Sequence, residues 1–556
     1  MHDVDAVVVG SGAGGLAAAL CLARAGWKVL VLEQHYLPGG WCHSFTLGGY
    51  RFSPGVHYMG ELGPGGEFRR IYEGLGVSGD LEFVELNPDG YDHVRIGSES
   101  FDIPKGKEAF AERLKSRFPR EREGIDGYLG VVKKIGRELP ALVEFRGLRD
   151  FAWLPFRAPN VARWGFSTLS SLLRRHVRDP LLAAILSTQC GDHGLPPSIA
   201  PAVLHASIAA HYLEGGWYPR GGGFAIPRAF VRAIRSHGGE IRMRAPVERI
   251  LVERSGSRRR AIGVRLADGS EIRARRVISN ADPGVTFGRL VEADHLSRRI
   301  RRRLARTRWS VSCLSLFLAT DLDLREEGLD SGNYWYSRTP DVEELYRTMS
   351  RPAAIEVEEI PGLFLTATAL KDPSKEPRFG HHTMEAFWFV PRDPFDAWAA
   401  SPHGERPEGY RKLKAGLMAR MLRAAGRIVP GLEKRVVFAD LGTPLTNEHY
   451  VAATAGAVYG TEKGRGQVGP WSFQARTEIE GLFLCGASTV AHGVMGATLS
   501  GLVAAREVLG CRTDDLLDAR GPQIVLRSAE DPATWPEPVR GRIEARLGAR
   551  VARGQG

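Results

Sequence analysis

The sequence predicts an α/β protein whose first unit is a Rossmann-like strand–helix–strand. A β-branched run at residues 6–9 is followed by Gly10, Gly12 and Gly15 in G-x-G-x-x-G spacing. An uncharged stretch rich in Ala and Leu comes next, and a second apolar run ends in Glu33, which lies 18 residues beyond Gly15 (33 − 15). A chain of 556 residues is also too long for one simple core, so we expect two or more domains.

Each part of this unit has a physical role in binding a dinucleotide. Gly10 permits the tight turn, Gly12 lets the backbone approach a pyrophosphate, and Gly15 lets the helix predicted at 14–25 pack on the strand. The helix N-terminus offers N–H groups to the pyrophosphate. The acid at the tip of the second strand (28–32) binds a ribose hydroxyl. A strand–helix–strand unit without a ligand remains the alternative.

Two uncharged runs, 6–23 and 481–505, could be mistaken for membrane spans. Four glycines fall within residues 10–15, and five lie in the second run, which argues against helices that cross a bilayer. Asp3 and Asp5 precede the first run, where a signal peptide would be basic. We therefore expect neither a membrane span nor a signal peptide.

The composition is that of an ordinary globular protein, with 43% hydrophobic and 25% charged residues. The six cysteines contain no C-x-x-C pair, so we expect no disulfide framework, no metal site and a reducing, cytoplasmic compartment. They are Cys21, Cys42, Cys190, Cys313, Cys485 and Cys511.

Two basic segments raise the question of an anionic partner, because the net charge is +11. The arginine cluster at 297–309 suits a solvated helix face, with an anionic membrane surface or nucleic acid as alternatives. No nucleic-acid-binding module is recognisable, so we expect no such partner. In 145–179, aromatic residues alternate with arginines, as in segments that lie in a lipid interface or in a lid over a pocket. Pro155 and Pro159 interrupt this segment, and we expect peripheral contact with the inner face of the membrane.

Several longer motifs resemble one known family. A glycine pair such as Gly39–Gly40 after Glu33 occurs in flavoproteins, whereas an NAD-dependent domain does not generally require one. The other motifs are CGDHGLPPS (190–198), HASIAAHYLEGGWYPRGGG (205–223), LKDPSKEP (370–377) and LGTPLTNEHYVAATAGAVYG (441–460). Together they resemble the phytoene desaturase, carotenoid isomerase and retinol saturase group of FAD-dependent oxidoreductases, and most of all its last two branches. The resemblance covers roughly residues 1–510.

This resemblance implies a Rossmann-like FAD-binding domain of the GR2/amine-oxidase type with an inserted α+β substrate domain. The FAD-binding domain would come from 1–66, 218–284 and 471–510, and the substrate domain from 67–217 and 285–470, with 511–556 as a tail of unknown role. Alternating strands are predicted at 310–320, 362–370 and 383–391, in a sheet with one apolar face over the flavin. Asp268-Gly269 predicts a hairpin before the strand at 277–281.

The resemblance also implies which residues hold FAD. They lie in the glycine loop, in the turn after the second strand, at the point where the backbone would meet the adenine, and in the last segment, near the ribityl chain and pyrimidine end. They are Gly10, Gly12, Ala13, Gly14, Gly15, Glu33, Gln34, Gly39, Gly40, Trp41, His57, Val247, Asn280, Gly486, Ala487, Gly493, Val494 and Met495. Two acids usual in the family are missing, at Ser53 and at Ala487–Ser488.

A polyene substrate would need one further group. Hydride transfer at a flavin leaves charge on the polyene that a proton must quench or release, so one weak acid or base near the flavin would suffice. The candidates are Asp192, His193, Glu214 and Tyr218, for each of which a structural hydrogen bond is the alternative. No second G-x-G-x-x-G follows a strand, so an external electron donor or acceptor is expected.

The predicted function is saturation or cis–trans isomerisation of a retinoid, carotenoid or other isoprenoid polyene. Phytoene-type desaturation is the alternative within the same chemistry. A flavin amine oxidase is a second class, which the middle motifs disfavour. A non-catalytic FAD-binding scaffold is a third, which the two missing acids allow.

Overall fold

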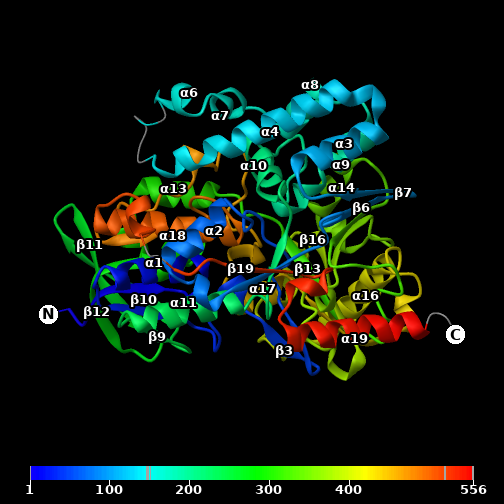
Figure 1. Cartoon of the computed structure of the whole chain (residues 1–556). Coiled ribbons are helices and arrows are strands. Elements are labelled where there is room, and N and C mark those ends of the chain that lie inside the picture. Colours follow the sequence, from blue (N-terminus) through cyan, green and yellow to red (C-terminus); the bar gives the residue numbers. More distant parts are fainter. Residues whose placement is uncertain (1, 146–149, 151, 519–520, 554–556) are drawn as a thin grey trace.

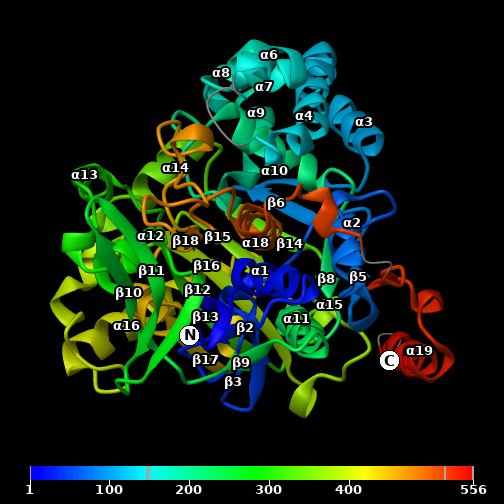
Figure 2. The same cartoon turned by 90° about the vertical axis from the view of Figure 1, so that its left-hand side faces the viewer.

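The computed structural model describes residues 2–145, 150, 152–518 and 521–553, without the side chains of 547–553. Two seven-stranded sheets lie next to each other, and helices from residues 107–186 gather at one end of the molecule (Figures 1 and 2). Residues 1–66, 218–284 and 471–510 supply the strands of the first sheet, and 67–217 and 285–470 those of the second. The domain boundaries themselves stay a prediction.

The first sheet is parallel at its centre. Its strand order is β10-β11-β12-β1-β2-β9, with β18 paired to the end of β12. The parallel strands are β1 (Val4–Val9), β2 (Val29–Leu32), β9 (Glu240–Arg242), β12 (Glu271–Ser279) and β18 (Leu482–Leu484). β10 (Val247–Ser255) and β11 (Arg258–Leu266) extend it as an antiparallel meander, and the predicted hairpin at Asp268-Gly269 is present. Val7 and Val8 point into different cores, which explains the continuous apolar run in β1.

Three helices cover one face of this sheet: α1 (Ala13–Arg24), α11 (Ala225–Ser236) and α18 (Gly493–Leu509). A Cβ on Gly501 of α18 would lie 2.2 Å from the carbonyl oxygen of Gly14, so α18 and α1 touch backbone to backbone. The two uncharged runs are therefore strand–turn–helix units, β1 with α1 and β18 with α18. Among the described helices, none is long and apolar enough to cross a membrane.

The second sheet has the order β17-β13-β16-β15-β14-β6-β7. Its strands are β6 (Asp92–Ile96), β7 (Glu99–Ile103), β13 (Ser312–Thr320), β14 (Asn333–Ser337), β15 (Gly362–Thr366), β16 (His382–Val390) and β17 (Val436–Gly442). All neighbours are antiparallel except β14 and β6. The strands predicted at 310–320, 362–370 and 383–391 correspond to β13, β15 and β16, but β15 ends at Thr366 and the predicted residues after it enter the short helix α15 (Thr368–Lys371).

β13 is buried along its whole length, so it is apolar on both faces and not on one. Leu314, Leu316 and Leu318 lie in the large core of the second sheet. Phe317 instead packs against the hairpin of β3 (Phe45–Leu47) and β4 (Tyr50–Phe52). This hairpin belongs to residues 1–66. It covers the face of β13 for which the sequence indicated no packing partner.

Helices surround the second sheet. α14 (Val342–Met349) and α16 (Glu408–Ala425) pack on its strands. α3 (Lys107–Arg117), α4 (Arg122–Val143), α9 (Pro180–Leu186) and α10 (Ala202–Tyr212) belong to the same core. The segment 145–179 forms α6 (Leu154–Arg157), α7 (Pro159–Trp164) and α8 (Leu169–His176), with prolines at the starts of α6 and α7. Its residues 146–149 and 151 lie outside the described part.

The C-terminal tail is part of the fold. β19 (Val525–Ser528) pairs with β5 (Glu82–Glu85), which also pairs with β8 (Trp217–Pro219). Glu530 forms an ion pair with Arg325 (2.7 Å) and accepts a hydrogen bond from the backbone N of Ser331 (3.0 Å). α19 (Glu537–Arg553) then runs along the outside of the molecule (Figure 1). The tail thus ties the second sheet to β5.

Candidate functional site

The loop between β1 and α1 turns tightly at the carboxyl ends of the parallel strands. Gly10 has φ +91, and a Cβ on Gly15 would lie 2.2 Å from its carbonyl oxygen. A Cβ on Gly12 would lie 2.6 Å from Nδ2 of Asn280. α1 begins at Ala13 without a side-chain cap, so the N–H groups of its first turn are available to a ligand.

Glu33 lies at the end of β2 and is buried. Its Oε2 accepts hydrogen bonds from the backbone N (2.9 Å) and the hydroxyl (2.6 Å) of Ser11, and its Oε1 accepts one from the backbone N of His35 (2.8 Å). A carboxylate has about four lone-pair sites, so one site remains for a ribose hydroxyl. Gln34, the next residue, is exposed.

The turn at Gly39 and Gly40 returns to the glycine loop. Gly39 forms a parallel bridge with Gly12, and its N–H donates to the hydroxyl of Ser11 (3.1 Å). A Cβ on Gly40 would lie 3.4 Å from Cα of Gly12. Trp41 follows in a short 3-10 turn and is half-buried. Two backbone segments therefore approach one another at the site predicted for the pyrophosphate.

Asn280 follows β12 and stands between the glycine loop and the last segment of the chain. Its backbone N donates to Val9 O (2.9 Å). Its side-chain oxygen lies 2.7 Å from the position of a Cβ on Gly14 and 3.2 Å from that of a Cβ on Gly486. Larger residues at these glycines would displace it. Val247 is buried at the start of β10.

A second helix N-terminus lies in this region, where α18 begins with Gly493, Val494 and Met495. His492 is its N-cap, and its side chain does not cap the helix. The Nδ1 of His492 is buried and has no hydrogen-bond partner among the described residues. A glycine loop, an acid at the tip of β2, two uncapped helix N-termini and this unpaired nitrogen fit the pyrophosphate, the ribose and the charge of FAD.

Asp192 connects this region to a second cluster of polar groups. His492 Nε2 donates to its carbonyl oxygen (2.6 Å). The Oδ2 of Asp192 accepts a hydrogen bond from the hydroxyl of Tyr58 (3.2 Å). Burial, with a smaller contribution from the charge of Asp92, raises the pKa of the Asp192 carboxyl to about 8. Asp192 is therefore a carboxylic acid at neutral pH, although part of the residue stays accessible.

His193 belongs to a buried series of hydrogen bonds that runs from the backbone of Leu195 to that of Leu186. Its Nδ1 accepts from the backbone N of Leu195 (3.2 Å), and its Nε2 lies 3.3 Å from Nδ1 of His205. Nε2 of His205 donates to Leu186 O (2.9 Å). The sulfur of Cys190 completes a group whose ligand atoms lie within 4.8 Å of one another. Because Nδ1 of His193 accepts an N–H, its own proton is on Nε2, which leaves no lone pair there for a metal.

The other two catalytic candidates differ in their surroundings. Glu214 is exposed at the end of α10, whereas Tyr218 is buried in β8. The ammonium of Lys371 lies 5.6 Å from the ring centroid of Tyr218 and 6.0 Å from that of Tyr58. The structure thus places Tyr218 beside the group around Tyr58 and leaves Glu214 at the surface. Their catalytic roles stay predictions.

Two charged residues that the sequence did not reveal stand where the family acids are missing. Glu385 of β16 is fully buried, its Oε1 accepts from the backbone N of Ser53 (2.7 Å), and its Oε2 lies 3.3 Å from Nδ1 of His57. Lys463 donates to Ala487 O (2.5 Å), and burial lowers its pKa to about 7. Both come from distant segments, so no local motif could have indicated them.

Comparison with known proteins identifies the family. Residues 13–509 match the model of the flavin containing amine oxidoreductases. The chain belongs to this family. All-trans-retinol 13,14-reductase of Danio rerio is 33% identical over 533 residues, which cover 91% of this chain and 86% of that protein. Chloroplastic prolycopene isomerase of Arabidopsis thaliana is 28% identical, over 91% of this chain and 82% of that protein.

The solved structure of cyclohexylamine oxidase from Brevibacterium oxydans shares the fold. Its TM-score is 0.56 at 17% identity, and the match covers 93% of this chain and 99% of that one. The predicted fold class is confirmed, with its nucleotide-binding sheet and the second sheet inserted into it. The protein is an FAD-dependent oxidoreductase, as predicted. The roles of individual residues toward FAD stay predictions.

Replacing Gly12 should abolish FAD binding. In Gly12→Val the added side chain would collide with Asn280 and displace the loop from the pyrophosphate. Gly416→Ala is the matched control, because Gly416 is exposed in α16 and a Cβ there meets no atom within 4 Å. The ratio of flavin absorbance to protein after purification measures the effect. Stoichiometric FAD in Gly12→Val would contradict the assignment.

Proposed function

We propose that this flavoprotein saturates or isomerises the conjugated double bonds of an isoprenoid polyene, such as a retinoid or a carotenoid. The observation that carries this proposal is the position of Asp192, whose backbone carbonyl accepts a hydrogen bond from His492 before α18 and whose buried carboxyl is protonated at neutral pH. FAD, when bound, exchanges a hydride with the substrate. Saturation adds a proton as well, and Asp192 donates it. Desaturation would require a base, and an acid with a pKa of about 8 is protonated at neutral pH.

Aromatic side chains adjoin Asp192 and support an apolar, conjugated substrate. A Cβ on Gly191 would lie 2.1 Å from the ring of Trp335, so this indole lies directly against the backbone before Asp192. Trp335 contacts Phe364 (4.6 Å between centroids), and Phe364 lies beside Phe387 (6.0 Å). The hydroxyl of Tyr459 donates to Gly191 O (2.7 Å). Such walls suit a flat polyene.

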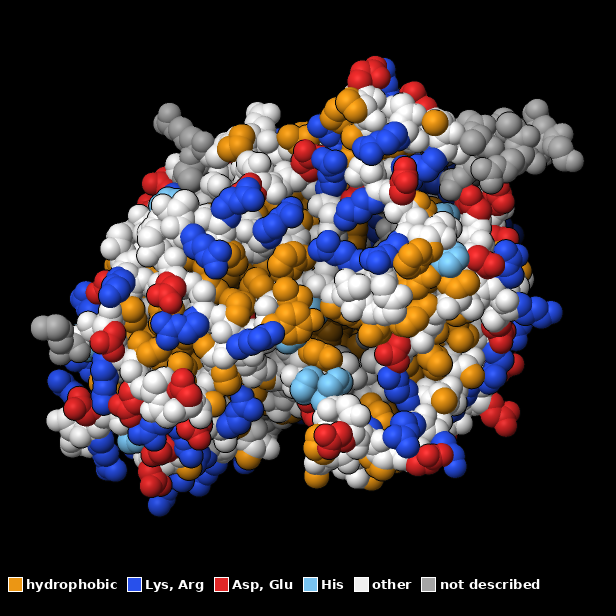
Figure 3. Space-filling view, turned by 90° about the horizontal axis from the view of Figure 1, so that it is seen from below, with side chains coloured by type: hydrophobic (Ala, Val, Ile, Leu, Met, Phe, Trp, Pro, Cys, Tyr) orange, Lys and Arg blue, Asp and Glu red, His pale blue; other side chains and the backbone are white. Residues whose placement is uncertain are grey.

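The surface and the relatives give further support. The face in Figure 3 has hydrophobic side chains and histidines around a central hollow. The relatives from Danio rerio and Arabidopsis thaliana are named for two polyenes, retinol and prolycopene. We also propose an external electron donor. The N-terminus of α18 would stabilise negative charge on reduced FAD, and that charge would in turn favour the protonated form of Lys463, which contacts Ala487.

We propose in addition that the protein docks peripherally on the inner face of the membrane. Phe166 (73% exposed) contacts Trp471 (50% exposed) at 6.0 Å, and we call this pair the aromatic surface. Arg465 donates to Phe166 O (3.0 Å) and Arg303 to Trp471 O (2.6 Å). The two basic segments noted in the sequence therefore meet here, since Arg303 belongs to α13 (Arg298–Arg306). Arginines beside exposed aromatic rings suit anionic lipid.

The reaction is tested anaerobically with chemically reduced holoprotein. Reduced protein mixed with all-trans-retinol or a poly-cis carotene should shift the polyene absorption to the blue or isomerise it. Asp192→Asn should slow this conversion by about 100-fold or more, the usual contribution of a general acid, while FAD stays bound. Asp89→Asn, at an exposed carboxylate before β6, is the control and should keep the rate. Full activity of Asp192→Asn would overturn the assignment of the acid.

Membrane docking is tested by vesicle flotation. The protein should float with phosphatidylcholine vesicles that contain phosphatidylserine, and added salt should weaken binding because the charges are exposed. Exchange of Phe166 and Trp471 for Ser should reduce binding by about tenfold. Phe379→Ser removes another exposed aromatic ring (65%) and should have no effect. Equal binding to neutral vesicles would contradict the proposal.

A further inference from the structure

Two carboxyl groups in the interior share one tyrosine hydroxyl. The hydroxyl of Tyr58 lies 3.2 Å from Oδ2 of Asp192 and 3.4 Å from Oδ2 of Asp92. The ring of Tyr58 stacks on that of Tyr212 (4.1 Å between centroids, 11° between planes), which fixes the direction of the hydroxyl. One hydroxyl carries one hydrogen and can donate to only one carboxylate at a time. The second contact is a hydrogen bond only if its carboxyl carries a proton.

The surroundings decide which carboxyl is ionised. Asp92 is fully buried and accepts a hydrogen bond from Nδ2 of Asn333 (3.1 Å). The Oδ1 of Asn333 accepts from the ammonium of Lys371 (2.6 Å), which also donates to His57 O (2.5 Å). The amide favours a negative charge on Asp92, and the protonated form of Lys371, whose pKa burial lowers to about 7, does so to a smaller extent. Burial raises the pKa of Asp92 to about 6, which is lower than the value of about 8 for Asp192.

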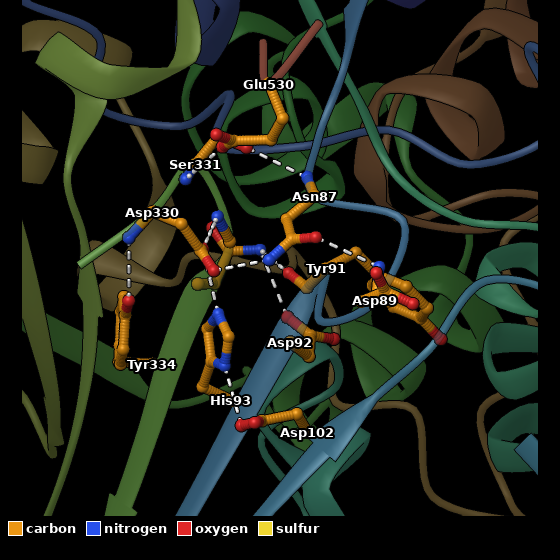
Figure 4. Close-up of polar contacts among 12 residues, drawn as sticks. Asn87, Asp89, Tyr91, Asp92, His93, Asp102, Asp330, Ser331, Tyr334 and Glu530 are labelled. Carbon is orange, nitrogen blue, oxygen red and sulfur yellow. Dashed lines mark hydrogen bonds and ion pairs between the residues drawn. The ribbon is translucent and has the colours of Figure 1, made fainter. Parts of the chain in front are cut away.

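The strand that carries Asp92 is held firmly on its other side. His93, the next residue of β6, lies between Asp102 (2.7 Å from Nδ1) and Asp330 (2.8 Å from Nε2), as Figure 4 shows. These two hydrogen bonds to carboxylates outweigh burial and raise the pKa of His93 to about 9. Asp330 also accepts from the backbone N of Gly332 (2.7 Å). These contacts hold the backbone of β6 next to Asp92 in place, and the hydrogen bond from Asn333 orients the Asp92 carboxyl.

Asp92 is the ionised group among the described side chains that face Asp192. The titratable groups around Asp192 are Tyr58 from the loop after β4, Tyr91 and Asp92 at β6, Tyr212 of α10, Tyr346 of α14, Tyr459, His492 before α18, and Cys190 and His193 beside it in the chain. Burial raises the pKa of the tyrosines and of the cysteine. It lowers the pKa of His492 to about 3 and holds that of His193 well below its usual range, so the tyrosines, the cysteine and both histidines stay neutral.

We propose that Asp92 and Tyr58 are positioning residues that control the proton on Asp192. This inference rests on the proposed role of Asp192 as proton donor. In that step the O–H bond of Asp192 breaks as a C–H bond forms on the substrate, and the hydride comes from the reduced cofactor, which the external donor supplies with electrons. Two carboxylates then face one hydroxyl, and their repulsion favours uptake of a proton by Asp192 from water. Asp92 thus restores the acid for the next turnover.

The test uses two variants with opposite expected shifts. The single-turnover rate of the reduced holoprotein should fall as pH rises through about 8, because Asp192 must be protonated. Asp92→Asn removes the repelling charge and should lower the pH at which the rate falls by about one unit, which makes the rate at pH 8 roughly fivefold lower than in the wild type. Tyr58→Phe removes a hydrogen bond to the ionised form of Asp192 and should raise the pH at which the rate falls.

A second readout does not depend on turnover. The infrared C=O band of the Asp192 carboxylic acid, identified by its loss in Asp192→Asn, should titrate with the same shifts without substrate. Asp89→Asn is the control, because Asp89 is an exposed carboxylate just before β6. It should leave both the pH at which the rate falls and the titration of the infrared band unchanged. If Asp92→Asn does not fold, Tyr58→Phe decides alone.

The outcomes separate this inference from the proposed function. Full activity of Asp192→Asn would overturn the proposed donor. A second result would overturn only the roles of Asp92 and Tyr58. In this case Asp192→Asn loses activity, but the Asp192 band titrates at the wild-type pH in Asp92→Asn, or at the same or a lower pH in Tyr58→Phe.

Discussion

The backbone contact between α18 and α1 is the constraint on which the rest of the structure depends. Gly501 meets Gly14 so closely that neither position accepts a side chain without displacement. This contact places the N-terminus of α18 near the glycine loop, with Asn280 between them. It also sets His492, which precedes α18 and hydrogen-bonds Asp192 O. One helix crossing therefore fixes both the nucleotide site and its distance from the acid.

Buried charges are distributed unevenly around this crossing. Glu385 faces Ser53 and His57, and Lys463 contacts Ala487, so one family acid is replaced by a carboxyl group from another strand and the other by a lysine whose pKa burial lowers to about 7. A buried charge without a partner is costly, which explains why Lys371 lies within reach of both Glu385 and Asp92. Protonation of Lys463 near Ala487 would make the site favour reduced FAD, in keeping with hydrogen addition rather than removal.

Local patterns predicted the nucleotide-binding half well. The glycine spacing, Glu33, the Asp268-Gly269 hairpin and the strand leading to Asn280 depend on short-range geometry, and the structure contains each of them. The cluster of Asp192, Tyr58 and Asp92 was predicted only in part. A motif indicated Asp192, whereas its two partners come from other segments. Tyr58 lies 134 residues away in the sequence. Glu214 shared a motif with Tyr218, yet the end of α10 turns it outward, and periodicity in a single sequence does not reveal such a turn.

The central claim is that the reduced protein adds hydrogen to a polyene, with a proton from Asp192. The most direct measurement is the deuterium content of the product after one anaerobic turnover of reduced holoprotein with all-trans-retinol in D₂O. Our account predicts a saturated product with deuterium on the carbons of the former double bond, and no such product from Asp192→Asn. Conversion only by the oxidised protein, with loss of hydrogen from phytoene to a quinone, would contradict it.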